Sequence, residues 1–152
     1  MIQLHKWFAG CLGVGRVKGG GTITAILCCA AWLLLQKLGV EGNILVVVTS
    51  LVTALGVWSA SMVEPYWGKD SSMVVIDEAA GMMISLLFIP VTVANVLIAL
   101  VLFRFFDIAK PLFIRRMEAL PGGWGVMADD VLAGIYSNIV LQLLIYYNIT
   151  GR

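Results

Sequence analysis

Four long stretches of the chain carry no charged side chain, and they limit its possible folds more than any other feature. These stretches are 19–36, 42–63, 79–103 and 131–151. A helix of about 20 apolar residues crosses the hydrocarbon core of a bilayer, so each stretch is long enough to span it. Only 12% of the 152 residues are charged, whereas a typical soluble domain carries about 25%. We therefore expect a single all-α domain embedded in a membrane.

The net charge and the cysteine pattern exclude several classes of protein. Ten Lys and Arg against nine Asp and Glu leave a formal charge of +1, which argues against a nucleic-acid binder or a polybasic membrane-surface protein. Cys11, Cys28 and Cys29 have the spacing of neither a disulfide framework nor a zinc site. The N-terminal segment lacks a small-x-small cleavage site, so we expect it to be retained as an interfacial segment.

Pro90 lies near the middle of the third neutral stretch, which is therefore either one kinked helix or two shorter helices joined by a turn. With one helix, the ten cations divide five to five between the two faces of the membrane. With two helices, eight cations share one face and two lie on the other. The second distribution matches the positive-inside rule, which assigns the crowded face to the cytoplasm. We favour a hairpin of two short helices at Pro90.

The favoured arrangement has about five transmembrane or half-membrane helices, of which the third and fourth form the hairpin. Their expected ranges are about 22–38, 43–63, 74–89, 93–107 and 129–148, with cytoplasmic loops at 64–73 and 108–128. Each arm of the hairpin is roughly 21–24 Å long at 1.5 Å per residue, so the bilayer must thin or neighbouring helices must bury the arms. The same arrangement places eight of the nine acidic residues on the cytoplasmic face.

Five of these acidic residues lie at the expected helix ends. Asp77 and Glu78 open the third helix, Asp107 closes the fourth, and Asp129 and Asp130 open the fifth. One carboxylate at a helix N-terminus can be a cap, but in each consecutive pair one carboxylate is left over near the hydrocarbon edge. Such acids usually have a counter-ion. Oxygen ligands without histidine or thiolate match Mg²⁺, so we expect a magnesium site.

Small residues follow both acidic pairs at helical spacing. Gly81 and Ser85 lie on one stripe with Asp77, and Gly134 lies on one stripe with Asp130. Small residues let membrane helices approach closely. We expect these two helices to pack together and to bring their carboxylates into one site.

Cations are interleaved with the acids. Arg104 lies one helical turn before Asp107, and Lys110 lies one turn after it. For Arg116, snorkelling to anionic lipid headgroups is as good an explanation as a role in the site. Because Arg104 and Lys110 flank the acid cluster, we expect them to bind phosphate oxygens that the metal does not reach.

The glycine-rich stretch 13–22 includes Arg16 and Lys18 and matches neither a dinucleotide-binding fingerprint nor a Walker loop. It is equally consistent with an anion cradle and with a flexible loop. Cys11 lies one residue too close to Arg16 for the Cys-x5-Arg loop of tyrosine phosphatases, and no Gly-x-Ser-x-Gly elbow is present. The remaining residues support attack on a phosphoryl group by a metal-activated water.

Taken in order, the three motifs at 76–81, 103–116 and 122–134 resemble the phosphatidylglycerophosphatase A family of bacterial membrane lipid phosphatases, with Gly21-Thr22 as a weaker anchor upstream. The resemblance implies hydrolysis of phosphatidylglycerol phosphate to phosphatidylglycerol and inorganic phosphate, with Mg²⁺ as cofactor. It implies a multi-pass protein of the bacterial cytoplasmic membrane. Together with the cation count, this predicts an active site that faces the cytoplasm.

The family's motifs carry expected roles onto this chain. The expected metal ligands are Asp77, Glu78, Asp107, Asp129 and Asp130. Asp77, Asp129 and Asp130 form the expected catalytic set, in which Asp130 orients the attacking water. The expected phosphate contacts are Arg104, Lys110, Lys18 and Arg115. Stretch 15–20 departs from the serine- and proline-containing loop of many family members, and Lys18 is the candidate to replace it as a phosphate contact.

Other classes of function stay open at this point. A small ion or proton transporter would place acids near mid-membrane, where only Asn95, Asn138 and Gln142 provide polarity. A non-catalytic assembly partner would use the glycine-rich helix faces for packing. A different lipid-phosphate phosphatase, or a phosphotransferase that couples a nucleotide-activated lipid to an alcohol, would also use clustered aspartates. The sequence carries no signal for an oligomeric state.

Overall fold

The computed structural model describes residues 1–147, which form helices without any strand. In chain order these are α1 (Ile2–Ala9), η1 (Cys11–Arg16), α2 (Gly20–Lys37), α3 (Gly42–Trp67), α4 (Ile76–Leu86), α5 (Val93–Ala109), α6 (Ile114–Met117) and α7 (Gly123–Tyr146). Three of them, α2, α3 and α7, are long and apolar enough to cross a membrane. The all-helical membrane class expected from the neutral stretches is confirmed.

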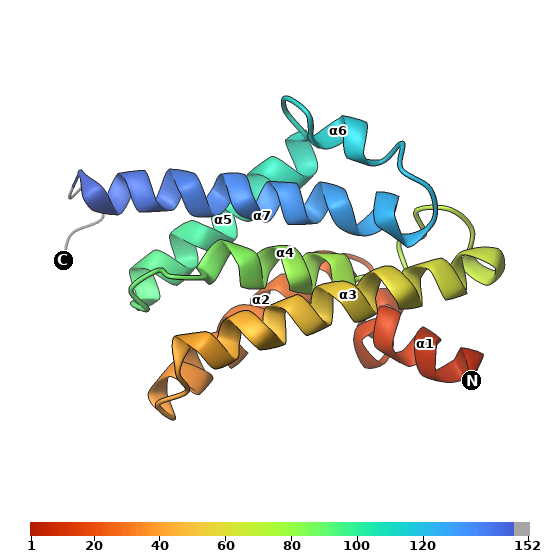
Figure 1. Cartoon of the computed structure of the whole chain (residues 1–152), viewed down its shortest axis with the longest axis horizontal. Coiled ribbons are helices and arrows are strands. Elements are labelled where there is room, and N and C mark those ends of the chain that lie inside the picture. Colours follow the sequence, from red (N-terminus) through yellow and green to blue (C-terminus); the bar gives the residue numbers. More distant parts are fainter. Residues whose placement is uncertain (148–152) are drawn as a thin grey trace.

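Helix α4 lies at the centre of the bundle. It packs against α2, α3, α5 and α7, and Figure 1 shows it between α3 and the long α7. The outward faces of the surrounding helices carry large apolar side chains, among them Leu27, Val47, Leu97, Val101 and Ile139. An apolar exterior around a buried central helix is the distribution expected for a protein surrounded by lipid.

Helices α4 and α5 are separate elements, joined by residues 87–92 with Pro90 inside the connection. Thr92 caps α5, because its hydroxyl accepts a hydrogen bond from the Asn95 backbone N–H at 3.1 Å. The Asn95 side chain donates to the Pro90 carbonyl at 2.8 Å. Two hydrogen bonds thus tie the first turn of α5 to the connection that contains Pro90.

The carbonyls at the end of α4 are satisfied by one side chain of α7. The Asn138 amide nitrogen donates to the carbonyl oxygens of Ile84 and Ser85 at 3.1 Å each and of Leu87 at 2.8 Å. The last carbonyls of a helix have no partner within it. A polar residue in the middle of α7 thus allows α4 to end inside the bundle.

Glycines set the close approach of α4 and α7. A Cβ added to Gly134 would collide with the carbonyl oxygen of Gly81, and one added to Gly81 would lie 2.6 Å from the carbonyl oxygen of Asp130. Ser85 donates to the Gly81 carbonyl at 2.9 Å and lies 3.4 Å from that of Gly134. This confirms the close packing expected from the small-residue stripes.

Several helix boundaries differ from the expected ranges; α4, for example, spans Ile76–Leu86 and not 74–89. Helix α7 begins at Gly123 and not near 129, because the Gly123 N–H is bonded to the Ser61 hydroxyl of α3 at 2.9 Å. The acidic pair therefore lies inside α7 and does not open it. Helix α3 continues past Val63 to Trp67 with Pro65 in its last turn, so the loop expected at 64–73 begins later. The loop expected at 108–128 is shorter, because α5 ends at Ala109 and α7 begins at Gly123. The end of the last predicted helix, at 148, lies outside the described residues.

Candidate active site

Carboxylates from two helices meet where α4 and α7 pack together. Asp77 and Glu78 lie in the first turn of α4, and Asp130 lies two turns into α7. One oxygen from each of the three lies within 4.8 Å of the others, and Asp130 is only 3% exposed. Like charges this close repel each other strongly when water is excluded, and either protonation of a carboxyl or a nearby cation relieves that repulsion.

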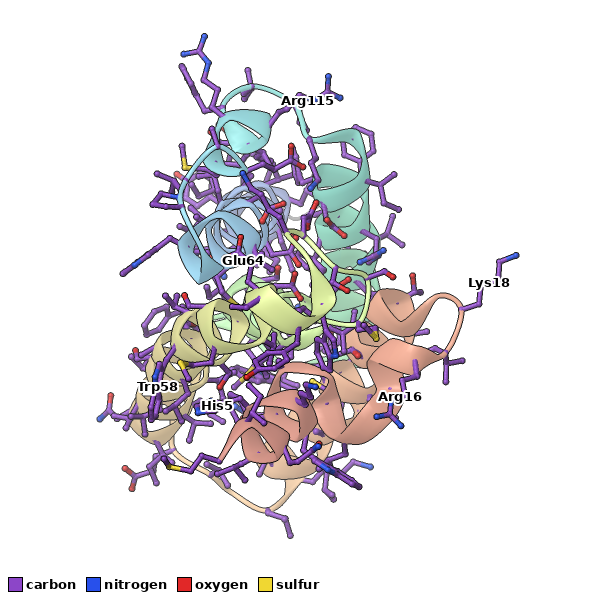
Figure 2. The ribbon with its side chains drawn as sticks, turned by 90° about the vertical axis from the view of Figure 1, so that its right-hand side faces the viewer. His5, Arg16, Lys18, Trp58, Glu64 and Arg115 are labelled. Atoms are coloured by element: carbon purple, nitrogen blue, oxygen red, sulfur yellow. The ribbon has the colours of Figure 1, made fainter. Side chains whose placement is uncertain are left out.

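Several buried carboxylate oxygens have no hydrogen-bond partner among residues 1–147. They are Asp77 Oδ1, Glu78 Oε2 and Asp129 Oδ1. Buried polar atoms without a partner are rare in folded proteins and call for an explanation, such as a bound ion. The single histidine, His5, does not join the cluster but contacts Ser59 at 3.1 Å and the ring of Trp58 (Figure 2). A donor set made only of carboxylate oxygens fits Mg²⁺.

Gly21 at the start of α2 fixes the position of Glu78. A Cβ at Gly21 would collide with the carboxylate of Glu78. The sequence places Gly21 in a possible anion cradle at 13–22 and in a Gly-Thr anchor, but it does not predict the contact with Glu78. Its function is to let the backbone of α2 approach a carboxylate of the cluster.

Replacing Gly21 with alanine is expected to lower activity at least about tenfold, because the added methyl displaces the Glu78 carboxylate from its partners. The end of the Glu78 side chain can rotate, so the thermal unfolding temperature should change little. Gly42→Ala is the matched control, since nothing lies within 4 Å of a Cβ at that position. Rates of phosphate release and thermal unfolding in detergent measure both effects. Wild-type activity in Gly21→Ala would exclude this role for Gly21.

Arg104 joins Asp107 to the cluster. Its Nη1 lies 2.6 Å from Asp107 Oδ2 and 4.0 Å from Glu78 Oε1. The guanidinium therefore neutralises carboxylates, while its Nε is buried and has no hydrogen-bond partner among the described residues. Nη1 also lacks a hydrogen bond of good geometry within residues 1–147, so the guanidinium keeps donors that the carboxylates do not use.

Lys110 holds Asp129. Its Nζ lies 2.6 Å from Asp129 Oδ2 and 2.6 Å from Glu118 Oε1. Burial alone would lower the pKa of Lys110, but the hydrogen bonds to Asp129 and Glu118 outweigh it and raise the pKa above its ordinary value. Lys110 is therefore a charged bridge between two carboxylates. Sequence reasoning did not assign Glu118, although it is the only acid between 112 and 128.

Comparison with known proteins agrees with this geometry. A family model described as phosphatidylglycerophosphatase A matches residues 7–145. The chain belongs to the phosphatidylglycerophosphatase A family. It is therefore a phosphatase, and the match includes every helix that contributes a carboxylate to the cluster. No solved structure gives a significant match.

Three curated relatives of this phosphatidylglycerophosphatase A family member cover most of the chain. A protein of Bacteroides thetaiotaomicron, named "putative phosphatidylinositol-3-phosphatase", is 44% identical over 81% of this chain and 81% of its own length. Phosphatidylglycerophosphatase A of Haemophilus influenzae is 39% identical over 84% of this chain and 75% of its own. The Escherichia coli protein of the same name is 31% identical over 82% of this chain and 73% of its own length. These similarities favour a membrane lipid phosphatase over a transporter or an assembly partner.

Two cations that the sequence predicts as phosphate contacts lie at the edge of this protein. Figure 2 shows Lys18 and Arg115 projecting from different edges of the helical body. Arg115 lines a cleft of about 480 Å³ together with Lys69, Asp70 and Glu118. Neither Lys18 nor Arg115 forms a salt bridge within residues 1–147. The structure therefore separates them from the cations that are already paired with carboxylates.

Cys11 does not provide a nucleophile for the phosphatase. Burial, with a smaller contribution from the nearby Glu78 charge, raises the pKa of its thiol to about 11. The thiol also points to the Val75 carbonyl at 3.7 Å. A thiol that stays protonated at neutral pH is a poor nucleophile, so Cys11 is unsuited to attack phosphorus.

Proposed function

We propose that this protein hydrolyses phosphatidylglycerol phosphate to phosphatidylglycerol and inorganic phosphate with Mg²⁺ as cofactor. The observation that carries the proposal is the cluster of Asp77, Glu78 and Asp130, whose oxygens lie within 4.8 Å of one another. The substrate follows from the two relatives named phosphatidylglycerophosphatase A. The diacyl tails would stay in the bilayer beside the apolar helix faces while the headgroup enters the polar site.

The proposed mechanism assigns a task to each charged group. Asp77 and Glu78 would hold the cation, with Asp129 and Asp107 at the margin of the site. A bound Mg²⁺ neutralises phosphoryl charge and favours deprotonation of water. Asp130 orients the attacking water and accepts its proton. The water oxygen bonds to phosphorus as the bond from phosphorus to the glycerol oxygen breaks, and the departing glycerol oxygen takes up the proton that Asp130 accepted from the water.

The proposed roles of the cations follow from the ion pairs that they form within the protein. Arg104 donates from Nε to a phosphoryl oxygen, because this N–H is buried and has no partner within residues 1–147. Lys110 keeps Asp129 in place through its 2.6 Å contact. Arg115 lies farther out, where it meets the lipid headgroup as it approaches.

We also propose the orientation in the membrane. Helices α4 and α5 form a short hairpin with its turn at Pro90 in the bilayer, so that five helices cross or enter the membrane. This places the acid cluster at the cytoplasmic face of the bacterial inner membrane. The proposal is supported by the separation of α4 from α5 and by the eight-to-two distribution of cations that it produces.

A second candidate substrate is phosphatidylinositol 3-phosphate, because the 44% identical relative carries that activity in its name. Both lipids present a phosphate monoester on a polar headgroup. The structure within residues 1–147 holds no contact that separates a glycerol from an inositol headgroup.

Phosphate release by the purified protein in mixed micelles tests the function. Phosphatidylglycerol phosphate, phosphatidylinositol 3-phosphate and phosphatidic acid are supplied in turn, with Mg²⁺ or with EDTA. We expect phosphatidylglycerol phosphate to be hydrolysed at least about tenfold faster than the others, and EDTA to abolish the reaction. A preference for the inositol lipid would overturn the substrate but keep the lipid phosphatase. Full activity in EDTA would overturn the metal mechanism.

A further inference from the structure

A second cleft lies next to the acid cluster and is not used by the proposed chemistry. It has a volume of about 600 Å³ and is lined by residues 15–21, which we call the glycine loop, together with Ser72, Met73 and Glu78. Glu78 belongs both to this cleft and to the acid cluster. A ligand bound at the cluster can therefore extend directly into the cleft.

The glycine loop gives this cleft two cations, which exceed the charge of Glu78, the one acid in its lining. Arg16 and Lys18 line the cleft and are exposed, and neither forms a salt bridge within residues 1–147. Arg104 and Lys110, on the other side of the cluster, are each within 2.6 Å of a carboxylate. The cations free to meet an anionic headgroup from this side are thus those of the glycine loop.

The backbone of the glycine loop is fixed by its contacts. A Cβ at Gly15 would collide with the backbone of Met73, so the loop rests directly on the segment that leads into α4. Gly19 has a φ of +78°, in the left-handed region that favours glycine. The backbone of the loop therefore fixes where the Arg16 and Lys18 side chains begin relative to Glu78.

A comparable cleft elsewhere on the molecule does not have this excess of charge. Its volume is about 480 Å³, and its two cations, Lys69 and Arg115, are accompanied by Asp70 and Glu118. The positive and negative side chains there balance. An anionic group of a ligand that extends beyond the acid cluster is therefore attracted more strongly to the cleft of the glycine loop.

We propose that Arg16 and Lys18 bind the phosphodiester that links the lipid to its headgroup, while the acid cluster receives the terminal phosphate monoester. This inference rests on the proposed function. The diester is present in phosphatidylglycerol phosphate and in phosphatidylinositol 3-phosphate, so the glycine loop selects headgroups that carry a second phosphate whichever of the two is the substrate. Lys18 then contacts the diester and not the reacting phosphate to which the sequence assigned it.

The test separates the two phosphate positions in the full-length protein. Arg16→Gln and Lys18→Gln are assayed for KM and kcat on phosphatidylglycerol phosphate and for the inhibition constant of inorganic phosphate, which occupies only the position of the terminal monoester. We expect each substitution to raise KM about tenfold and the pair to raise it more. The inhibition constant of inorganic phosphate should change less than about twofold, and Arg16→Lys should recover most of the affinity.

Lys37→Gln is the matched control, because this exposed cation lies at the other end of α2. It should leave KM unchanged. Equal weakening of the lipid and of inorganic phosphate would overturn the proposal, since the loop would then bind the reacting phosphate. An unchanged KM in the double variant would overturn it as well. Failure of the wild-type protein to hydrolyse either lipid would instead overturn the proposed function.

Discussion

Asp130→Asn is expected to reduce phosphate release at least about a thousandfold at saturating Mg²⁺ and lipid. The substitution removes the group that accepts the proton of the attacking water and one of the three carboxylates that lie within 4.8 Å. Its side chain is 3% exposed, so no water can replace the lost oxygen easily. The measurement is kcat from phosphate release in mixed micelles.

The same substitution is expected to change stability in opposite directions with and without the cation. Without Mg²⁺, Asp130→Asn should raise the unfolding temperature above that of the wild type, because it relieves repulsion among three buried carboxylates. Adding Mg²⁺ should stabilise the wild type by mass action and should stabilise the variant much less. Thermal unfolding in detergent, with EDTA or with Mg²⁺, measures this crossing independently of activity.

Asp70→Asn is the matched control for Asp130→Asn. It makes the same chemical change at an exposed residue in the segment before α4 and should keep kcat and the Mg²⁺ effect within about twofold of the wild type. A loss of activity in Asp130→Asn without a change in the Mg²⁺ effect would show that Asp130 acts on water but does not contribute to the metal site. Wild-type activity in Asp130→Asn would remove it from the mechanism.

The neutral stretches and the acidic motifs predict the outline of this molecule because both depend on periodicity and spacing. The first two stretches become α2 and α3, and the stripes of Gly81 and Gly134 become the contact between α4 and α7. Repeated spacing carries this information, since residues three or four apart share a helix face. The sequence also identifies Asp77, Glu78 and Asp130, which the structure brings together.

Spacing does not determine which charged side chains pair. Arg104 and Lys110 lie close to the acids in sequence, as a phosphate clamp requires, yet their shortest contacts are with Asp107 and Asp129 at 2.6 Å. Glu118 joins Lys110 from a segment whose path depends on tertiary packing. The start of α7 could not be predicted from the sequence either. Its first backbone N–H donates to the hydroxyl of Ser61, which belongs to another helix.

Asn138→Leu is expected to lower the free energy of unfolding by roughly 2–4 kcal/mol, because three carbonyls at the end of α4 lose their only side-chain donor within residues 1–147. Lipid offers no replacement hydrogen bond. Polar residues in the apolar interior of the chain could have indicated an ion pathway. The contacts of Asn138 and Asn95 instead explain this polarity as termination of helices inside the bundle.

Gln142→Leu separates this effect from a general loss of polarity in α7. Gln142 donates to the side-chain oxygen Oδ1 of Asn138, which is its one side-chain hydrogen bond within residues 1–147. Its replacement therefore frees no carbonyl of α4 and should lower stability by less than about 1 kcal/mol. Both variants are compared by equilibrium unfolding in detergent micelles. Equal destabilisation by the two substitutions would contradict the account, because the end of α4 would then owe nothing specific to Asn138. A larger effect of Asn138→Leu supports a helix end that is held inside the bundle by one amide.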